Sequence, residues 1–202
     1  MKTRIIIVRH AETIGNIEKR LTGRNDYELT PKGEDSTKAL FEELKNIKFD
    51  IAYASTEDRT TKTIIKIVKY NKIEIIKLKE LSEMYFGIYD GWKWEDVNKI
   101  NPNIKKTQEK INSIEGIPEQ ESMKDVARRM LKCIKRIVEE NEGKTILIAS
   151  HGVAIEALIR EITDVPFSEE REKYCQHNCA INELIFENSK FNIIRLADIS
   201  YL

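Results

Sequence analysis

The sequence has few of the features that mark secreted, membrane-bound or nucleic-acid-binding proteins. It carries three cysteines, Cys133, Cys175 and Cys179, an odd number without the paired spacing of a metal site. That usage favours a reducing compartment over a disulfide framework. Basic and acidic residues balance at 34 each, so no overall field draws the protein to nucleic acid or to an anionic membrane surface. We therefore expect no nucleic-acid partner, and any anion site must be local.

Long hydrophobic runs are also absent. The first apolar run lies between Met1 and Arg9 and is much too short for a signal sequence or a membrane span. No internal repeat or low-complexity linker interrupts the chain. A length of 202 residues fits one domain with a core large enough to hold an active site. We therefore expect a cytoplasmic protein with one domain over residues 1–202 and no membrane contact.

Familiar metal and nucleotide motifs are missing as well. The chain has three histidines, and none of them forms HxxxH or HExxH. No cluster of carboxylates has the spacing of metal ligands. Neither GxxxxGK nor GxGxxG occurs. We expect no metal, no cofactor and no nucleotide-binding loop.

What the sequence does contain is an alternation of strand and helix patterns. Its first run, rich in Ile and Val, is typical of a strand buried on both faces of a parallel sheet. The patterns predict strands at 4–8, 51–54, 73–78, 145–149, 182–186 and 192–196, and helices at 31–45, 57–70, 94–100, 122–143 and 153–162. This order indicates an α/β fold, a three-layer sandwich with a mainly parallel central sheet flanked by helices. Residues 84–121 lack a long period and predict a capping insertion.

Two histidines follow predicted strands of this sheet. His10 comes after the strand at 4–8, and His151 comes after the strand at 145–149. In open α/β sheets the ligand site lies beyond the carboxyl ends of the strands. We therefore expect the two imidazoles to lie close together, although either histidine alone would more often be structural.

Two arginines accompany these histidines. Arg9 directly precedes His10, and Arg59 lies in the first turn of the helix predicted at 57–70. A guanidinium presents a rigid fork of donors that matches the oxygens of a phosphate group. Arg59 alone would normally be a solvated helix residue. Together, Arg9, Arg59 and His151 predict a phosphate-sized clamp around His10.

The order of these motifs resembles the histidine phosphatase superfamily, also called phosphoglycerate mutase-like. The resemblance covers roughly residues 4 to 185 and implies the phosphoglycerate mutase-like form of the fold described above. The segments that carry it are Arg9-His10-Ala11-Glu12-Thr13, Asn16, Gly23, Asp26, Leu29-Thr30-Pro31-Lys32-Gly33, Ser55, Arg59, Leu81-Ser82-Glu83, Phe86-Gly87, Asp90-Gly91, Glu121-Ser122 and Ser150-His151-Gly152. One departure is Ala11, which stands where the family usually has glycine and predicts a tighter approach to His10.

The resemblance implies a set of roles for these residues. His10 would attack phosphorus in line and become phosphohistidine, while Arg9, Arg59 and His151 hold the phosphoryl oxygens. Such preorganised charges commonly supply the largest share of catalysis. Further phosphate or substrate contacts are implied for Asn16, Thr22, Gly23 and Gly152.

Glu83 resembles the family's proton donor. It would protonate the leaving alkoxide and then, as a carboxylate, help water to attack the phosphohistidine. That role requires a carboxyl group that holds a proton near neutral pH, so we expect Glu83 to be partly buried beside the phosphate site. Glu80 is the neighbouring competitor, but Glu83 has the family's spacing to Phe86-Gly87.

These observations predict a metal-independent phosphomonoester hydrolase that acts on a small phosphorylated metabolite and releases inorganic phosphate. The alternatives are a cofactor-dependent phosphoglycerate mutase and a phosphate-ester-binding regulatory protein with little turnover. The shortness of the chain, its end soon after the last strand, and Met84 after Glu83 favour the hydrolase. A second anionic group of the substrate could be bound by the lysines Lys93, Lys99, Lys105 and Lys106. The alternative is that these lysines form a solvated basic face. The natural ester stays open between sugar phosphates, phosphoglycerates and nucleotide-derived phosphates.

Overall fold

A six-stranded sheet forms the centre of the computed structural model, which describes residues 1–103, 116–167 and 171–202. Its strands are β1 Thr3–Arg9, β2 Ile51–Ala54, β3 Ile75–Lys77, β4 Thr145–Ser150, β5 Ile181–Glu187 and β6 Lys190–Asp198, in the spatial order β3-β2-β4-β1-β5-β6. The pairings of β3 with β2, β2 with β4, and β4 with β1 are parallel. β5 runs antiparallel to β1, and β6 runs antiparallel to β5. The mainly parallel sheet predicted from the sequence is confirmed.

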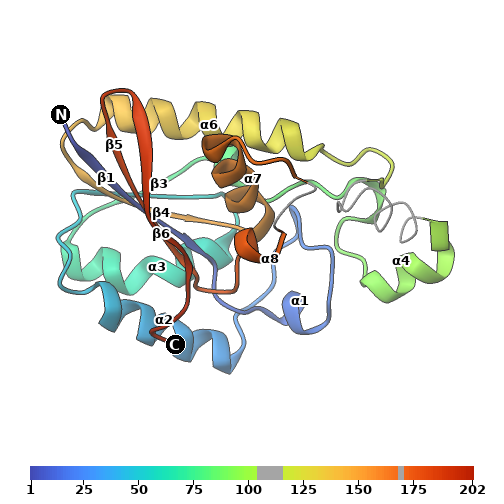
Figure 1. Ribbon diagram of the computed structural model, residues 1–202. Coiled ribbons are helices and arrows are strands. Elements are labelled where there is room, and N and C mark those ends of the chain that lie inside the picture. The colour runs from blue at the N-terminus through green and yellow to red at the C-terminus, as the bar shows by residue number, and fades with distance from the viewer. Residues whose placement is uncertain (104–115, 168–170) are drawn as a thin grey trace.

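Helices cover both faces of this sheet (Figure 1). Within the described residues the helices are α1 Ile14–Ile17, α2 Pro31–Leu44, α3 Asp58–Asn71, α4 Trp94–Ile100, α6 Met123–Glu140, α7 Gly152–Thr163 and α8 Arg171–Tyr174, with 3-10 turns η1 Lys79–Leu81 and η2 Gly87–Tyr89. The faces of the sheet are covered by α2 and α3 on one side and by α6 and α7 on the other. Successive side chains of a strand point to opposite faces. Accordingly, Ile5 and Ile7 of β1 pack with α6 and α7, whereas Ile6 and Val8 pack with α2 and α3. The predicted three-layer sandwich is confirmed.

Local sequence signals explain where several helices begin. Thr30 caps α2 by accepting a hydrogen bond from Gly33 N at 2.9 Å, and Pro31 occupies the first helical position. Ser122 caps α6 in the same way. Thr13 and Asn16 form a capping box that starts α1, a short helix inside the segment predicted as a loop.

Two predicted elements are shorter in the structure. The strand predicted at 73–78 is limited to β3, because β3 pairs only with β2 and the chain then turns into η1. The helix predicted to end near residue 143 ends at Glu140. There Asn141 donates its side-chain amide to Ile137 O and to the Tyr53 hydroxyl, and Gly143 adopts a positive φ of 78°.

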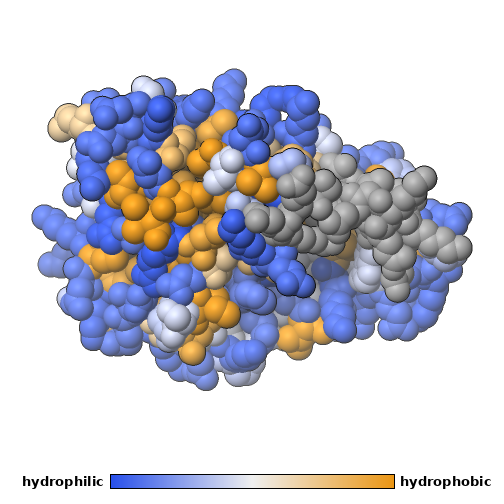
Figure 2. Space-filling view, viewed as in Figure 1, coloured by the Kyte–Doolittle hydropathy of each residue, from blue (hydrophilic) through white to orange (hydrophobic). Residues whose placement is uncertain are grey.

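The outer parts of the molecule differ in character. α4, from the segment predicted as a capping insertion, lies at the side of the molecule where the parallel strands end (Figure 1). Figure 2 shows hydrophobic residues gathered over the edge strand β6, where Ile194 is 59% exposed. Within the described residues, no helix combines the length and the apolar character that a bilayer crossing requires.

Candidate active site

The carboxyl ends of β1 and β4 bring two histidines together. The parallel register pairs Arg9 with Ser150, and the next amide, His10 N, donates to Ser150 O at 3.0 Å. His151 is the residue before α7. The rings of His10 and His151 lie with their centroids 5.2 Å apart at 61°. The strand pattern therefore predicted their proximity correctly.

The surroundings of His10 leave one ring nitrogen available. Its Nδ1 lies 2.8 Å from Ala11 O, and a carbonyl oxygen only accepts, so Nδ1 carries the proton. Burial lowers the pKa of His10 well below its usual value, and the nearby His151 ring and the cations Arg59 and Arg9 act in the same direction. The ring is therefore neutral near pH 7, with its Nε2 lone pair available as a nucleophile.

Arg9 presents an incompletely satisfied guanidinium. It donates from one terminal nitrogen to Gln176 O, while its buried Nε has no partner among the described residues. A Cβ at Gly152 would lie only 3.3 Å from that Nε, so glycine keeps this space open. Burial lowers the pKa of Arg9, whereas the carboxylate of Glu83 opposes the shift. A half-buried cation with an unused buried donor fits an anionic ligand.

Arg59 is completely buried and its donors are all engaged. Nε and one terminal nitrogen approach Nδ1 of His151 at 3.2 and 3.0 Å. The remaining hydrogen bonds go to Thr22 O, Gly23 O, Asn25 O and Asp26 Oδ1. In this arrangement Arg59 holds the loop at 22–26 against α3. A phosphoryl oxygen would have to replace one of these partners.

Both ring nitrogens of His151 are also engaged. Nδ1 accepts from Arg59, while Nε2 lies 2.7 Å from the Ser55 hydroxyl and 3.2 Å from Glu57 Oε2. Burial lowers the pKa of His151, and Arg59 adds to this shift, whereas the hydrogen bond to Glu57 opposes it. Sequence reasoning missed Glu57 as a site residue. Its signal was its place two residues before Arg59, at the start of the same helix.

Glu83 is held at the N-terminus of α7. It is 7% exposed, so the expected burial of this carboxyl group is present. Its Oε1 accepts from Met84 N at 2.9 Å and from Ala154 N at 3.0 Å, and its Oε2 accepts from Val153 N at 3.2 Å. Backbone N–H groups at a helix N-terminus favour an anion. The carboxylate is thereby fixed in orientation beside the pocket.

Arg129 of α6 holds the backbone that carries Glu83. It donates to Glu80 O and Ser82 O at 2.8 Å and to Glu83 O at 3.0 Å. Its guanidinium also pairs with Glu121 at 2.6 Å. No sequence signal marks this contact, because the partners are main-chain carbonyls on a distant segment.

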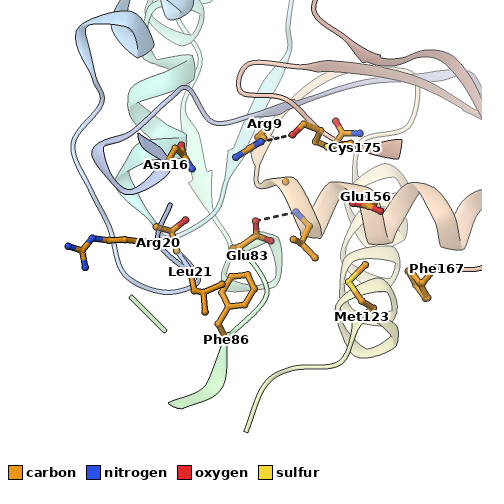
Figure 3. Close-up of a pocket in the computed structure, with 14 residues that line it drawn as sticks. Arg9, Asn16, Arg20, Leu21, Glu83, Phe86, Met123, Glu156, Phe167 and Cys175 are labelled. Carbon is orange, nitrogen blue, oxygen red and sulfur yellow. Dashed lines mark hydrogen bonds between the residues drawn. The ribbon is translucent and has the colours of Figure 1, made fainter. Parts of the chain in front are cut away.

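A pocket of about 260 Å³ lies over these groups. It is lined by Arg9, Asn16, Arg20, Leu21, Thr22, Glu83, Phe86, Met123, Gly152, Val153, Glu156, Phe167, Cys175 and Gln176. Figure 3 shows Arg9 and Glu83 facing one another across it, with Leu21 and Phe86 on one side and Met123 and Phe167 on another. The pocket thus joins a charged inner end to a largely apolar outer wall.

The structure distributes the predicted site residues between this pocket and its support. Asn16, Thr22 and Gly152 line it. Gly23 does not, since its N–H donates to Asp90 Oδ1 at 3.0 Å and its carbonyl accepts from Arg59. The lining residues that we describe do not include His10, Arg59 or His151. These three are buried, and His10 is 2% exposed.

Ala11 is accommodated without entering the pocket. Its side chain is completely buried, and its N–H donates to Thr63 Oγ1 at 2.8 Å. The lining described above does not contain it. The expected tighter approach to His10 is therefore not seen on the pocket side.

Other predicted contributors lie elsewhere. Lys93 and Lys99 pair with acidic neighbours, at 3.9 Å to Glu18 and 2.7 Å to Glu95, and line no part of the described pocket. Lys105 and Lys106 fall outside the described residues. Across residues 1–103, 116–167 and 171–202, no group of three His, Cys, Asp or Glu side chains is arranged to hold a metal ion.

Comparison with known proteins agrees with this architecture. The family model for the histidine phosphatase superfamily (branch 1) matches residues 5–199. A 2,3-bisphosphoglycerate-dependent phosphoglycerate mutase 2 from Gloeobacter violaceus is 32% identical over 168 residues, which span 78% of this chain and 74% of that protein. Bacillus stearothermophilus YhfR superposes with a TM-score of 0.92 at 25% identity, over 98% of each chain.

A phosphoserine phosphatase from Entamoeba histolytica, solved with 3-phosphoglyceric acid, superposes with a TM-score of 0.85 at 26% identity, over 99% of each chain. Similar proteins thus carry both phosphatase and mutase names. The match of the family model extends over nearly the whole chain and includes every segment of the site described above. This chain therefore belongs to the histidine phosphatase superfamily.

Proposed function

We propose that this chain is a phosphoric monoester hydrolase that works without a metal ion, through a phosphohistidine formed on His10. The observation that carries the proposal is the state of His10, a buried neutral imidazole with its proton on Nδ1 and cations on several sides. Access of the substrate phosphorus to Nε2 from the pocket is part of the proposal. The proposed catalytic residues are His10, Glu83, Arg9, Arg59 and His151, and the proposed phosphate or substrate contacts are Asn16, Thr22, Gly23 and Gly152.

The reaction would proceed in two displacements. Nε2 of His10 attacks phosphorus, the bond from phosphorus to the ester oxygen breaks, and Glu83 gives its proton to the leaving oxygen. Water then attacks the phosphohistidine, Glu83 takes the water proton, and inorganic phosphate leaves as the N–P bond breaks. Covalent catalysis divides one difficult displacement into two.

The guanidiniums and His151 would stabilise charge on the phosphoryl oxygens in both steps. Arg9 has an unused donor for this purpose. Arg59 would exchange its contact with His151 Nδ1 and a loop carbonyl for phosphoryl oxygens, and the loop at 22–26 would move with it. Because of this coupling, the conformation of the loop at 22–26 would depend on whether phosphate is bound.

The outer wall of the pocket favours hydrolysis over mutase chemistry. A mutase must hold the carboxylate of a phosphoglycerate in addition to the phosphoryl group. Besides Arg9, Arg20 is the one cationic residue in the described lining, and it is engaged with Glu18 and with Gly91 O. The residues Leu21, Phe86, Met123, Val153 and Phe167 instead offer apolar surface. We therefore propose a small phosphorylated metabolite whose alcohol part carries apolar surface and no second strong acid.

The names of similar proteins support the general part of this proposal, an enzyme that acts on phosphate esters. The Entamoeba histolytica protein is a phosphoserine phosphatase, which favours a hydrolase. The Gloeobacter violaceus protein is a phosphoglycerate mutase, which keeps the mutase as the second candidate.

A metal-free assay tests the proposed function. Wild-type protein and a His10→Ala variant are treated with EDTA and given p-nitrophenyl phosphate, an alkyl phosphate and 3-phosphoglycerate. We expect phosphate release by the wild type in EDTA and none above background by the variant. Transfer between phosphoglycerates without release of phosphate would identify a mutase. Phosphate binding with no turnover of any ester would identify a binding protein.

A further inference from the structure

Glu57 is a buried carboxylate to which the proposed reaction assigns no role. It is the residue before α3 and is 6% exposed. Its Oε2 lies 3.2 Å from His151 Nε2, and its Oε1 lies 3.3 Å from the Thr56 hydroxyl and 4.0 Å from Arg24. Burial opposes its ionisation, but hydrogen bonds from His151 and Ser55 outweigh burial and lower the pKa of this carboxyl group. Glu57 is therefore a fixed negative charge against the His151 ring.

The partners of His151 determine where its proton lies. Arg59 has donors and no acceptor, so the Nδ1 that it approaches at 3.0 and 3.2 Å must accept. The proton consequently sits on Nε2, where Ser55 and Glu57 accept it. With these partners the ring is neutral and presents a lone pair on the side of Arg59.

A phosphoryl group on or beside His10 requires the His151 ring to donate a hydrogen bond where it now accepts one. The two rings are 5.2 Å apart, so phosphoryl oxygens at His10 come next to His151. A lone pair repels an oxyanion, whereas an imidazolium N–H donates a charge-assisted hydrogen bond to it. Once the Arg59 donors have turned from Nδ1 to the phosphoryl oxygens, a proton on Nδ1 would make His151 such a donor, with Glu57 as the opposite charge at Nε2.

We propose that Glu57 is a positioning residue whose carboxylate lets His151 take up one proton at Nδ1 when a phosphoryl group binds. The N–H bond forms with a proton from the monoanion of the ester or from water, and no covalent bond of the protein breaks. The inference rests on the proposed function only in that a phosphoryl group binds beside His10. It gives His151 two states, a neutral ring in the free protein and a cation in the complex.

Several charged groups influence this equilibrium. Those facing the His151 ring or the Glu57 carboxylate are Arg59 of α3, His10 after β1, Glu83 after η1, and Arg24. Arg59 opposes a cation on the ring, and Glu83 favours it from a greater distance. Among the carboxylates that the structure describes, Glu57 alone is hydrogen-bonded to the ring. Removing its charge should therefore alter the protonation of the complex most strongly.

Binding of inorganic phosphate tests the proposal without turnover. We would measure its Kd by calorimetry between about pH 5 and pH 8 for the wild type and for Glu57→Gln. Loss of the counter-charge should weaken binding about ten-fold or more near pH 8, the size expected for a charge-assisted hydrogen bond. Near pH 5 the difference should shrink, because a high proton concentration charges His151 without help.

The imidazole resonances of the phosphate complex report the charge directly. Near pH 7.5 the Cε1 signal of His151 should have the position of an imidazolium in the wild type and of a neutral ring in Glu57→Gln. Asp58→Asn is the matched control. It removes a neighbouring charge that is exposed and paired with Lys77 at 2.8 Å, away from the ring, and it should behave as the wild type.

Each outcome decides the proposal. A neutral His151 in the wild-type complex, or equal weakening of phosphate binding by Glu57→Gln at every pH, would overturn it. If Glu57→Gln does not fold, Glu57→Asp keeps the charge, and the proposal then requires this variant to retain the pH dependence of phosphate binding. Wild-type protein that binds no phosphate would overturn this inference and the proposed function together. Binding with no hydrolysis of any ester would overturn the proposed function alone.

Discussion

The inner and outer parts of the pocket are built in different ways. The inner groups follow β1, β4 and η1 or begin α3 and α7, and hydrogen bonds fix them, as His10 Nδ1 to Ala11 O and Glu83 to the amides of α7 show. The outer wall is formed mainly by apolar side chains such as Leu21, Phe86 and Phe167 from loops and turns. We therefore expect the inner groups to determine the reaction and the outer wall to determine which ester binds.

Removing the proposed acid should give the largest effect at the inner end. Glu83→Gln should lower kcat for an alkyl phosphate by roughly 10²–10³-fold, because general acid catalysis supplies a factor of this size. The loss should be much smaller for p-nitrophenyl phosphate, whose leaving group needs no proton. Glu80→Gln, at a nearby carboxylate paired with Arg136, is the control. Equal losses for both esters would contradict the assignment.

Substitution of Arg9 should lower phosphate affinity, whereas substitution of Arg59 should also lower the stability of the fold. Arg9→Met removes one hydrogen bond to a carbonyl and an unused donor, so phosphate affinity should fall by about 10²-fold with little change in Tm. Arg59→Met leaves several loop carbonyls unpaired. A cost of about 3 kcal/mol would lower Tm by roughly 6–12 °C. Calorimetry measures both quantities, and equal Tm losses for the two variants would refute the distinction.

A change in the outer wall should affect selectivity and leave phosphate binding unchanged. Phe167→Ala should raise KM for an aryl ester about ten-fold, since burial of an aromatic ring contributes roughly 1.5–3 kcal/mol. The Ki of inorganic phosphate should stay the same. Phe41→Ala provides a matched control, because Phe41 packs on Tyr70 away from the pocket. A parallel rise in Ki would mean that the two parts of the pocket are not independent.

The protonation of His10 should give the smallest and most specific effect. Because the pKa of His10 lies well below 6.5, its neutral nucleophilic form persists as the pH falls, and protonation removes it only at lower pH. Ring resonances of the free protein, assigned with His10→Asn, His151→Asn and His177→Asn, should show His10 still neutral near pH 6. A normal titration of His10 around 6.5 would contradict the inner-site electrostatics.

Much of the inner site could be predicted from the sequence, because strand order and motif order determine it. The apolar runs before His10 and His151 implied two neighbouring strands, and parallel pairing then brought the rings together. Helix starts at Thr30 and Ser122 followed from capping residues. These are local or periodic signals, which can be read from a single sequence.

The rest depended on contacts without a sequence signature. Arg129 binds main-chain carbonyls of a segment about 46 residues away, which any residue type could supply. Glu57 reads as one of many charged helix residues until its distance to His151 is known. The engagement of all donors of Arg59 with the loop at 22–26 likewise required coordinates. The sequence therefore predicted most of the residues that the structure brings together, and the structure revealed Glu57, Arg129 and the way the others are held.

The central claim is that His10 carries the phosphoryl group during turnover, and trapping tests it most directly. Protein turning over p-nitrophenyl phosphate in EDTA would be quenched in alkali, where a phosphohistidine survives, and mapped by mass spectrometry of its peptides. The account predicts one phosphoryl group on His10 in the wild type and none in His10→Asn. A phosphoryl group on another residue, or its absence from His10 while phosphate is being released, would contradict the account.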